Sequence, residues 1–172
     1  MIKDVLYLDN FIDNSMKLFE DLRENIDWDE RMLARKTASF GVAYNYSDIF
    51  YPDNKMPKSI NEIAIKLQEI ISFLPNNCLI NYYLDGKSKM GYHSDQTDIL
   101  FENTGIAIIS LGETREIIFR NKENKENKVN YQLKTGSLLY MTQEVQEIWQ
   151  HSIPKNDTNN GRISLTFRKI KE

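Results

Sequence analysis

The sequence is poor in features that would place it in several large protein classes. It has a single cysteine, Cys78, so an internal disulfide framework is excluded, and its place before Leu79 and Ile80 predicts a buried strand residue. No apolar run approaches the roughly 20 residues that a membrane-spanning helix needs. The start, MIKDVLYLDNF, also lacks the long apolar stretch of a signal peptide. We therefore expect a protein that is not secreted and does not contact membranes, located in the cytoplasm, or in the nucleus if its source is eukaryotic.

An excess of positive charge is also missing. The formal net charge is -3, whereas proteins that hold nucleic acid through bulk electrostatics neutralise phosphates with Lys and Arg. Basic residues do gather locally, at Arg31, Arg35 and Lys36, at Lys87 and Lys89, and at Arg120, Lys122, Lys125 and Lys128. The last group overlaps the polar run NKENKENK, which we interpret as a solvated hairpin tip, with a phosphate contact as the alternative.

The pattern of apolar residues predicts both helices and strands. A chain of 172 residues is long enough for one domain with a sizeable core. Helical spacing predicts a helix over 13–25 and a second that opens with a capping box of Ser59 and Glu62 and ends at Pro75. Between them, 48–57 is predicted to be a loop, because two prolines bar regular structure.

From Cys78 onward, short segments separated by turns predict strands. They are CLINYY, KMGYHSD, GIAIISLG, REIIFR, VNYQL, SLLYM and RISLTFR. Several closely spaced strands without intervening helices indicate a sandwich or a barrel. The helix after Ser59 is expected to brace the back of the sheet.

Histidine is scarce, and its two positions suggest a metal site. His93 and Asp95 are two residues apart, so on an extended segment both side chains point to the same face. If the fold brings His151 alongside, the three form the two-histidine, one-carboxylate triad typical of non-haem Fe(II) oxygenases. A His-x-Asp pair is a weak signal by itself, and a hydrogen-bonded surface or core histidine is the alternative.

The last predicted strand, RISLTFR, places two arginines on one face. Strand alternation puts Ile163, Leu165 and Phe167 on one side, and Arg162, Ser164, Thr166 and Arg168 on the other. A solvated polar face is one interpretation of this pattern. The other is a cleft for a dicarboxylate, because guanidinium groups bind carboxylates through paired hydrogen bonds.

Several motifs together resemble the AlkB family of 2-oxoglutarate- and Fe(II)-dependent dioxygenases over roughly 40–170. They are Asn81-x-Tyr83, His93-x-Asp95, the distal His151 and Arg162-x-Ser164-x-Thr166-Phe167-Arg168. The eukaryotic-type DNA-repair members also show a YxDG turn, an FRxK, a GSLL and an HS-P motif, here at 83–86, 119–122, 136–139 and 151–154. Independent motifs in the family's order are far more specific than any one of them.

The resemblance implies an α+β fold and a set of cofactors. A single domain of residues 1–172 would have supporting helices and a substrate lid over about 1–76 and a double-stranded β-helix, or jelly-roll, core over about 77–170. Fe(II) would be bound by His93, Asp95 and His151, with 2-oxoglutarate and O2 as cosubstrates. Arg162 and Tyr83 would bind the distal carboxylate of 2-oxoglutarate, and Arg168 and Asn81 the end nearest the iron. Ser164 replaces the family's asparagine, and Thr166 shares its face.

The implied substrate is an alkylated base in single-stranded or locally opened nucleic acid, demethylated with release of formaldehyde. Candidate substrate contacts are Phe40, Tyr44, Tyr46, Thr97, Asp98 and Arg120. Thr97 stands where repair members carry an acidic residue, so Asp98 is the candidate replacement, and the β-propensity of tyrosine explains Tyr44 and Tyr46 equally well. A hydroxylase of a small molecule or protein side chain and a catalytically silent binding module remain alternatives. We expect a monomer.

Overall fold

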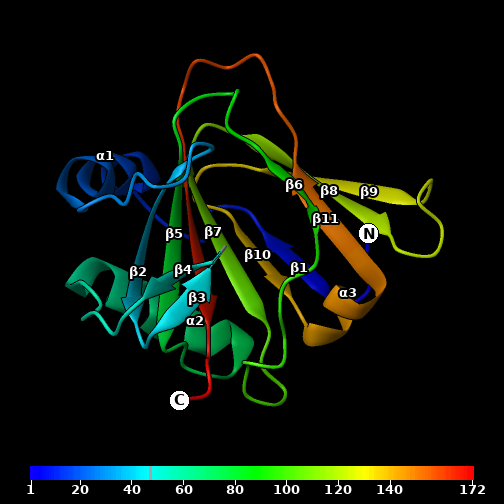
Figure 1. Ribbon diagram of the computed structural model, residues 1–172, viewed down its shortest axis with the longest axis horizontal. Coiled ribbons are helices and arrows are strands. Elements are labelled where there is room, and N and C mark those ends of the chain that lie inside the picture. Colours follow the sequence, from blue (N-terminus) through cyan, green and yellow to red (C-terminus); the bar gives the residue numbers. More distant parts are fainter. Residues whose placement is uncertain (47) are drawn as a thin grey trace.

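Two antiparallel sheets dominate the computed structural model, which describes residues 1–46 and 48–172 (Figure 1). The six-stranded sheet has the order β1 (Val5–Leu8), β10 (Leu138–Met141), β7 (Ile106–Gly112), β12 (Arg162–Arg168), β5 (Asn77–Tyr83) and β2 (Lys36–Gly41). The four-stranded sheet has the order β6 (Met90–His93), β11 (Trp149–Ile153), β8 (Arg115–Asn121) and β9 (Lys128–Leu133). The prediction of an α+β fold with a jelly-roll core is confirmed.

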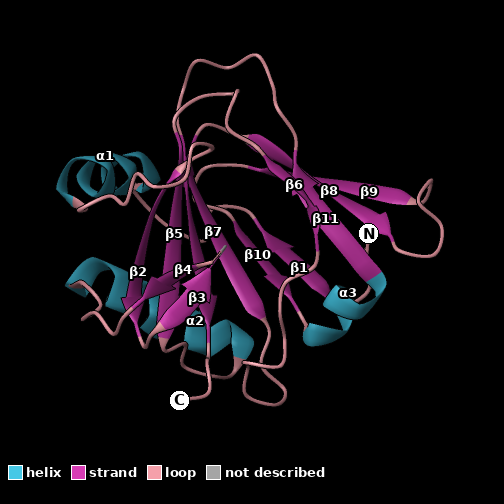
Figure 2. Cartoon of the chain, viewed as in Figure 1, coloured by secondary structure: helices cyan, strands magenta, loops and turns pink. Residues whose placement is uncertain are grey.

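Two helices cover one face of the six-stranded sheet, α1 (Ser15–Asn25) and α2 (Lys58–Ile71) (Figure 2). Their apolar faces join the sheet in one cluster, which includes Ile60 and Leu67 of α2 and Leu165 and Phe167 of β12. The helix predicted after Ser59 therefore does brace the sheet. A third helix, α3 (Gln143–Ile148), lies beside β11. None of the helices in the described residues is long and apolar enough to span a membrane.

The other face of the six-stranded sheet looks toward the four-stranded sheet across a second apolar cluster. Leu79 and Ile108 come from the larger sheet, and Phe119, Leu133 and Ile153 from the smaller one. Because both faces of the larger sheet are covered, β12 is buried along its whole length. Its alternation is as predicted, with the apolar residues facing the helices and the polar ones lining a cavity between the sheets.

The structure differs from the predictions in the 48–57 segment and at both ends of α2, where proline and capping residues did not mark the boundaries. β3 (Tyr44–Tyr46) and β4 (Ile49–Tyr51) pair as a hairpin, so part of the predicted 48–57 loop is a strand. Helix α2 begins at Lys58, with Pro57 at its N-cap and no side-chain cap, so the predicted capping box is wrong. The helix ends at Ile71 because Ser72 adopts a left-handed conformation with φ of 68°, well before Pro75.

The sequence patterns also did not predict β2, α3 and β11. Strand β11 lies between β6 and β8, and it carries His151. The hairpin tip between β8 and β9 is exposed over 122–127, in agreement with the interpretation of NKENKENK. Cys78 is fully buried in β5, as predicted.

Candidate active site

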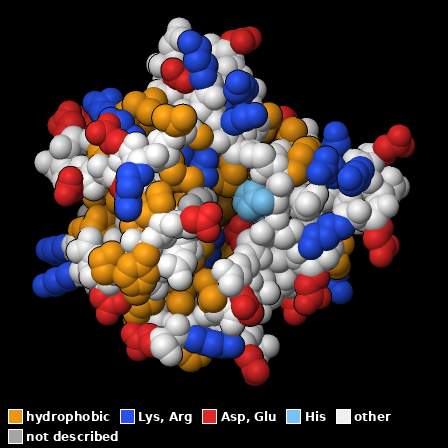
Figure 3. Space-filling view, in the orientation of Figure 1, with side chains coloured by type: hydrophobic (Ala, Val, Ile, Leu, Met, Phe, Trp, Pro, Cys, Tyr) orange, Lys and Arg blue, Asp and Glu red, His pale blue; other side chains and the backbone are white. Residues whose placement is uncertain are grey.

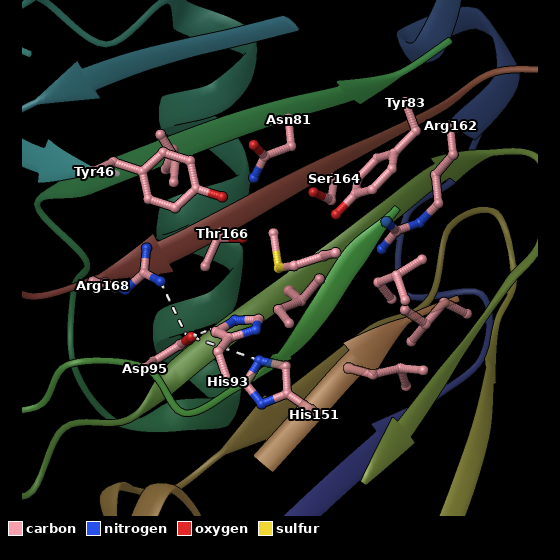
Figure 4. Close-up of a pocket in the computed structure, with 16 residues that line it drawn as sticks. Tyr46, Asn81, Tyr83, His93, Asp95, His151, Arg162, Ser164, Thr166 and Arg168 are labelled. Carbon is pink, nitrogen blue, oxygen red and sulfur yellow. Dashed lines mark hydrogen bonds and ion pairs between the residues drawn. The ribbon is translucent and has the colours of Figure 1, made fainter. Parts of the chain in front are cut away.

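Strand pairing brings the three predicted metal ligands together (Figure 4). His93 ends β6 and pairs in register with His151 of β11, so the two imidazoles lie side by side with ring centroids 4.4 Å apart. Asp95 follows in the loop after β6. Its Oδ1 lies 3.2 Å from Nε2 of His93 and 3.6 Å from Nε2 of His151.

The arrangement of donor atoms fits a metal ion. Two ligand atoms at right angles around a metal, each about 2.1 Å from it, lie about 3 Å apart. The distances from Asp95 Oδ1 to the two Nε2 atoms are close to this value. Nδ1 of His93 is 2.8 Å from the Gly91 carbonyl oxygen, which can accept the proton of Nδ1, so Nε2, the nitrogen on the Asp95 side, is the one that can bind a metal once it is deprotonated. Two imidazoles and one carboxylate are the donor set that suits Fe(II) and leaves coordination positions open.

The protonation states also suit metal binding. Burial lowers the pKa of His151 to about 4, so its imidazole is neutral at pH 7, the form that binds metals. For Asp95, burial opposes ionisation, but the attraction of His151, the hydrogen bond from His93 and the charge of Arg168 outweigh it and hold the pKa below its usual range. The carboxylate is therefore charged, and it accepts a 3.2 Å hydrogen bond from Arg168 at Oδ2.

A cavity, partly open to solvent, extends from the triad between the two sheets. Tyr46, Asn81, Tyr83, Arg162, Ser164, Thr166 and Arg168 of the predicted site line it, as do the apolar side chains of Leu79, Met90, Ile108, Ile117, Leu133 and Ile153. In the space-filling view, histidine atoms appear near the centre of the face, with hydrophobic and acidic side chains to their left and Lys and Arg side chains above and to the right (Figure 3).

The end of the cavity away from the triad is cationic. Arg162 is only 2% exposed, its guanidinium lies 5.1 Å from the centre of the Tyr83 ring, and it donates a 3.0 Å hydrogen bond to Ser110 Oγ. Its Nε has no partner in the described residues. Burial lowers the pKa of this arginine, although a guanidinium stays charged at neutral pH. A buried cation with unused donors is a site for an anion.

Arg35, which directly precedes β2 and was predicted only as part of a basic cluster with Arg31 and Lys36, contacts residues that line the cavity. It is buried and donates to Asn81 Oδ1 at 3.1 Å, to the Lys89 carbonyl at 3.2 Å and to the Tyr46 hydroxyl. Its two companions in that cluster are paired with acidic neighbours, Arg31 with Asp29 and Lys36 with Glu30. The cluster is therefore not a free basic patch.

The aromatic candidates separate into two groups. Tyr44 and Tyr46 stack with ring centroids 6.2 Å apart, and Arg168 lies 5.1 Å from the centre of the Tyr44 ring. Phe40, in contrast, packs into the apolar cluster on the helix side of the six-stranded sheet. The cause is its register with Cys78, which faces the same cluster. Phe40, predicted as a substrate contact, does not line the cavity.

The remaining substrate candidates also lie outside the cavity lining. Thr97 is in a turn in which its carbonyl accepts a hydrogen bond from the Leu100 amide, and Asp98 is exposed. Arg120 projects from the outer face of the four-stranded sheet, where its guanidinium lies 3.7 Å from the Tyr92 ring centre and donates to Gln150. None of these three side chains lines the cavity.

Comparison with known proteins agrees with this geometry. The family model of the 2OG-Fe(II) oxygenase superfamily matches residues 10–168. Mouse "DNA oxidative demethylase ALKBH2" is 29% identical over 90% of this chain and 74% of its own length. Mouse "Alpha-ketoglutarate-dependent dioxygenase alkB homolog 3" is 30% identical over 89% of this chain and 60% of its own length.

The chain belongs to the AlkB family of the 2OG-Fe(II) oxygenase superfamily. A solved structure, that of OsALKBH1, shares its fold, with a TM-score of 0.70 at 15% identity over 98% of this chain and 99% of that one. The AlkB-family assignment makes the protein a 2-oxoglutarate-dependent dioxygenase with Fe(II), 2-oxoglutarate and O2 as its cofactors, and the His-Asp-His triad is present.

Proposed function

We propose that this AlkB-family dioxygenase oxidatively demethylates alkylated bases in DNA or RNA, and that residues 1–172 form one catalytic domain. The observation that carries the proposal is a single cavity with a metal-binding triad near one end, a buried unpaired arginine at the other and a stacked tyrosine pair beside the triad. The names of the relatives, which describe oxidative DNA demethylation and 2-oxoglutarate dependence, support the same chemistry.

In this proposal His93, Asp95 and His151 hold Fe(II), which with 2-oxoglutarate and O2 supplies the oxidation of the substrate's methyl group. Arg162 binds the distal carboxylate of 2-oxoglutarate, because its guanidinium is buried and retains unused donors. The Tyr83 ring packs against the same guanidinium, and its hydroxyl is proposed to bind the same carboxylate. Arg162 and the triad would thus hold opposite ends of the cosubstrate.

At the end near the metal, Arg168 and Asn81 orient the cosubstrate. Arg168 already holds Asp95, and its Nε and one terminal nitrogen remain without partners in the described residues. Asn81 is held by Arg35, which leaves the amide nitrogen of Asn81 available to a ligand. Ser164 and Thr166 lie on the same strand face, and the hydroxyl of Ser164 donates one hydrogen bond with a shorter reach than the family's asparagine.

The tyrosine pair is the proposed platform for the substrate base. A base reaches the cavity only after it has been flipped out of its stack, at a cost of a few kcal/mol in a duplex and least in a single strand. Stacking of the base on an aromatic side chain stabilises the flipped base by roughly 1 to 3 kcal/mol, which offsets part of this cost. Tyr46 lines the cavity and Tyr44 supports it from behind. We place Thr97, Asp98 and Arg120 outside the base pocket, where they would contact the nucleic acid that flanks the flipped base.

The test is formaldehyde release from oligonucleotides that carry 1-methyladenine or 3-methylcytosine, as single strands and as duplexes. We expect release to be faster from single strands. Tyr46→Ala should reduce release while succinate still forms from 2-oxoglutarate without substrate, since stacking is lost but the metal centre remains. Asp98→Ala should have a smaller effect because Asp98 does not line the cavity. No formaldehyde from any oligonucleotide, with succinate formed in the presence of small molecules, would refute the demethylase proposal.

A further inference from the structure

The loop that carries Asp95 is tied to the segment that carries His151. From His93 to Asp95, each residue makes a hydrogen bond to a residue outside the triad. His93 Nδ1 is bonded to the Gly91 carbonyl at 2.8 Å, Ser94 Oγ donates to the Trp149 carbonyl at 2.8 Å, and the Asp95 amide donates to Gln146 Oε1 at 2.8 Å. Two of the three partners belong to α3 and the start of β11.

Gln146 is built into this position. It lies in α3 and is 3% exposed. Its Nε2 contacts the Met141 sulfur at 3.4 Å, which orients the amide so that Oε1 faces Asp95. Its backbone carbonyl accepts a 2.7 Å hydrogen bond from Lys122 Nζ, which holds α3 against the end of β8. The side chain therefore cannot rotate away without leaving buried polar groups unpaired.

The hydrogen bond between the Asp95 amide and Gln146 connects the segment that carries His93 and Asp95 with the segment that carries His151. Asp95 follows β6, whereas Gln146 lies only five residues before His151, and 51 residues separate Gln146 from Asp95. Without the Gln146 acceptor, the Asp95 amide must find another partner, and the loop has to turn to reach one. That turn moves the Asp95 carboxylate away from the two imidazole nitrogens.

We propose that Gln146 is a positioning residue of the metal centre, which holds the Asp95 carboxylate within coordinating distance of His93 and His151 before the metal binds. The proposal rests on the assignment of these three residues as metal ligands. Groups that orient metal ligands through hydrogen bonds typically contribute about 10- to 100-fold to metal affinity or activity. We expect a weakening of that size in Gln146→Leu, which removes the acceptor and leaves a buried side chain of similar size.

Gln143 provides a matched control in the same helix. Its Nε2 donates to the Phe101 carbonyl at 2.9 Å and to the Thr104 carbonyl at 2.6 Å. Gln143→Leu therefore also removes amide contacts to the backbone of the loop between β6 and β7, but at its far end from Asp95. The dissociation constant of Mn(II), an O2-inert substitute for Fe(II), is measured for each variant by electron paramagnetic resonance of free Mn(II). Thermal unfolding of the metal-free proteins reports stability separately.

We expect Gln146→Leu to weaken Mn(II) binding about 10- to 100-fold and Gln143→Leu to leave it unchanged. Gln146→Glu retains an acceptor at the same reach, so it should bind Mn(II) more tightly than Gln146→Leu. If Gln146→Leu does not fold, Ser94→Ala provides a second test, because it removes the hydrogen bond from Ser94 to the Trp149 carbonyl. It should still weaken Mn(II) binding relative to Gln143→Leu. Equal Mn(II) affinities in Gln146→Leu and the parent, or equal losses in both glutamine variants, would overturn the proposal.

The same assay separates this proposal from the ligand assignment. If His93→Ala, Asp95→Ala and His151→Ala all retain Mn(II) binding, the triad assignment is wrong and the Gln146 proposal fails with it. If the triad variants lose Mn(II) and Gln146→Leu does not, only the positioning role is wrong.

Discussion

Replacing Arg162 by lysine tests which end of the cosubstrate this residue binds. In the structure the guanidinium is buried at the end of the cavity away from the triad, with one hydrogen bond to Ser110 and an Nε that has no partner in the described residues. Because burial lowers its pKa, the free site carries a desolvation cost that a bound carboxylate would offset. A lysine keeps the charge but not the planar pair of donors.

The expected loss follows from one hydrogen bond to a charged group. Such a bond contributes about 1.5 to 3 kcal/mol, which corresponds to a roughly 10- to 150-fold weaker Kd for 2-oxoglutarate. The five-carbon monoacid 2-oxopentanoate has a methyl group in place of the distal carboxylate. Its affinity should change little in Arg162→Lys, since it has no partner for the guanidinium.

Calorimetric titration of both ligands into Mn(II)-loaded protein measures this difference. Arg23→Lys, at an exposed position, is the control for a general effect of the substitution and should bind 2-oxoglutarate as the parent does. An unchanged affinity for 2-oxoglutarate in Arg162→Lys would refute the reasoning. Equal losses for the two ligands would also refute it, because they would show that Arg162 does not distinguish the distal carboxylate.

Two further predictions concern the metal and the turns at one end of the sheets. His93→Ala, Asp95→Ala and His151→Ala should each abolish Mn(II) binding and succinate formation while the circular dichroism spectrum stays that of the parent. Asp95→Ala with the parent's turnover and metal content would contradict the assignment. Gly86→Ala should destabilise the protein by about 1 to 3 kcal/mol in urea unfolding, because its Cβ would overlap the Asn156 carbonyl oxygen. Gly91→Ala should cost less, since no heavy atom lies within 4 Å of the added Cβ, and an equal loss would contradict the steric cause.

The sequence patterns were sufficient where the signal is periodic over a whole element. Alternation in β12 correctly separated its helix-facing residues from those that line the cavity. The His-x-Asp spacing and the order of the family motifs placed His93, Asp95 and His151 together before any contact was known. The helix-forming stripe of α2 was also identified, although its first and last residues were not.

The patterns failed where a short element or a long-range register decides the outcome. Helix α3 has six residues, too few to show a helical period, and β11 has only five. Phe40 looked like a stacking residue because of its type, but the pairing of β2 with β5 turns it toward the helices. Arg35 and Gln146 carry no local signal at all, since their roles depend on partners 46 and 51 residues away.

The two arginines of β12 have different electrostatic surroundings, which fits the two different roles proposed for them. Arg168 is paired with the Asp95 carboxylate, so much of its charge is balanced within the protein. Arg162 makes no ion pair with any described residue, and its nearest polar partner is the neutral hydroxyl of Ser110. Both guanidiniums are buried, but only Arg162 has an uncompensated charge in the free protein. A monoacid would leave that charge unpaired, whereas a dicarboxylate neutralises it with its second carboxylate, which gives a physical reason for the use of 2-oxoglutarate rather than a shorter or less charged 2-oxo acid.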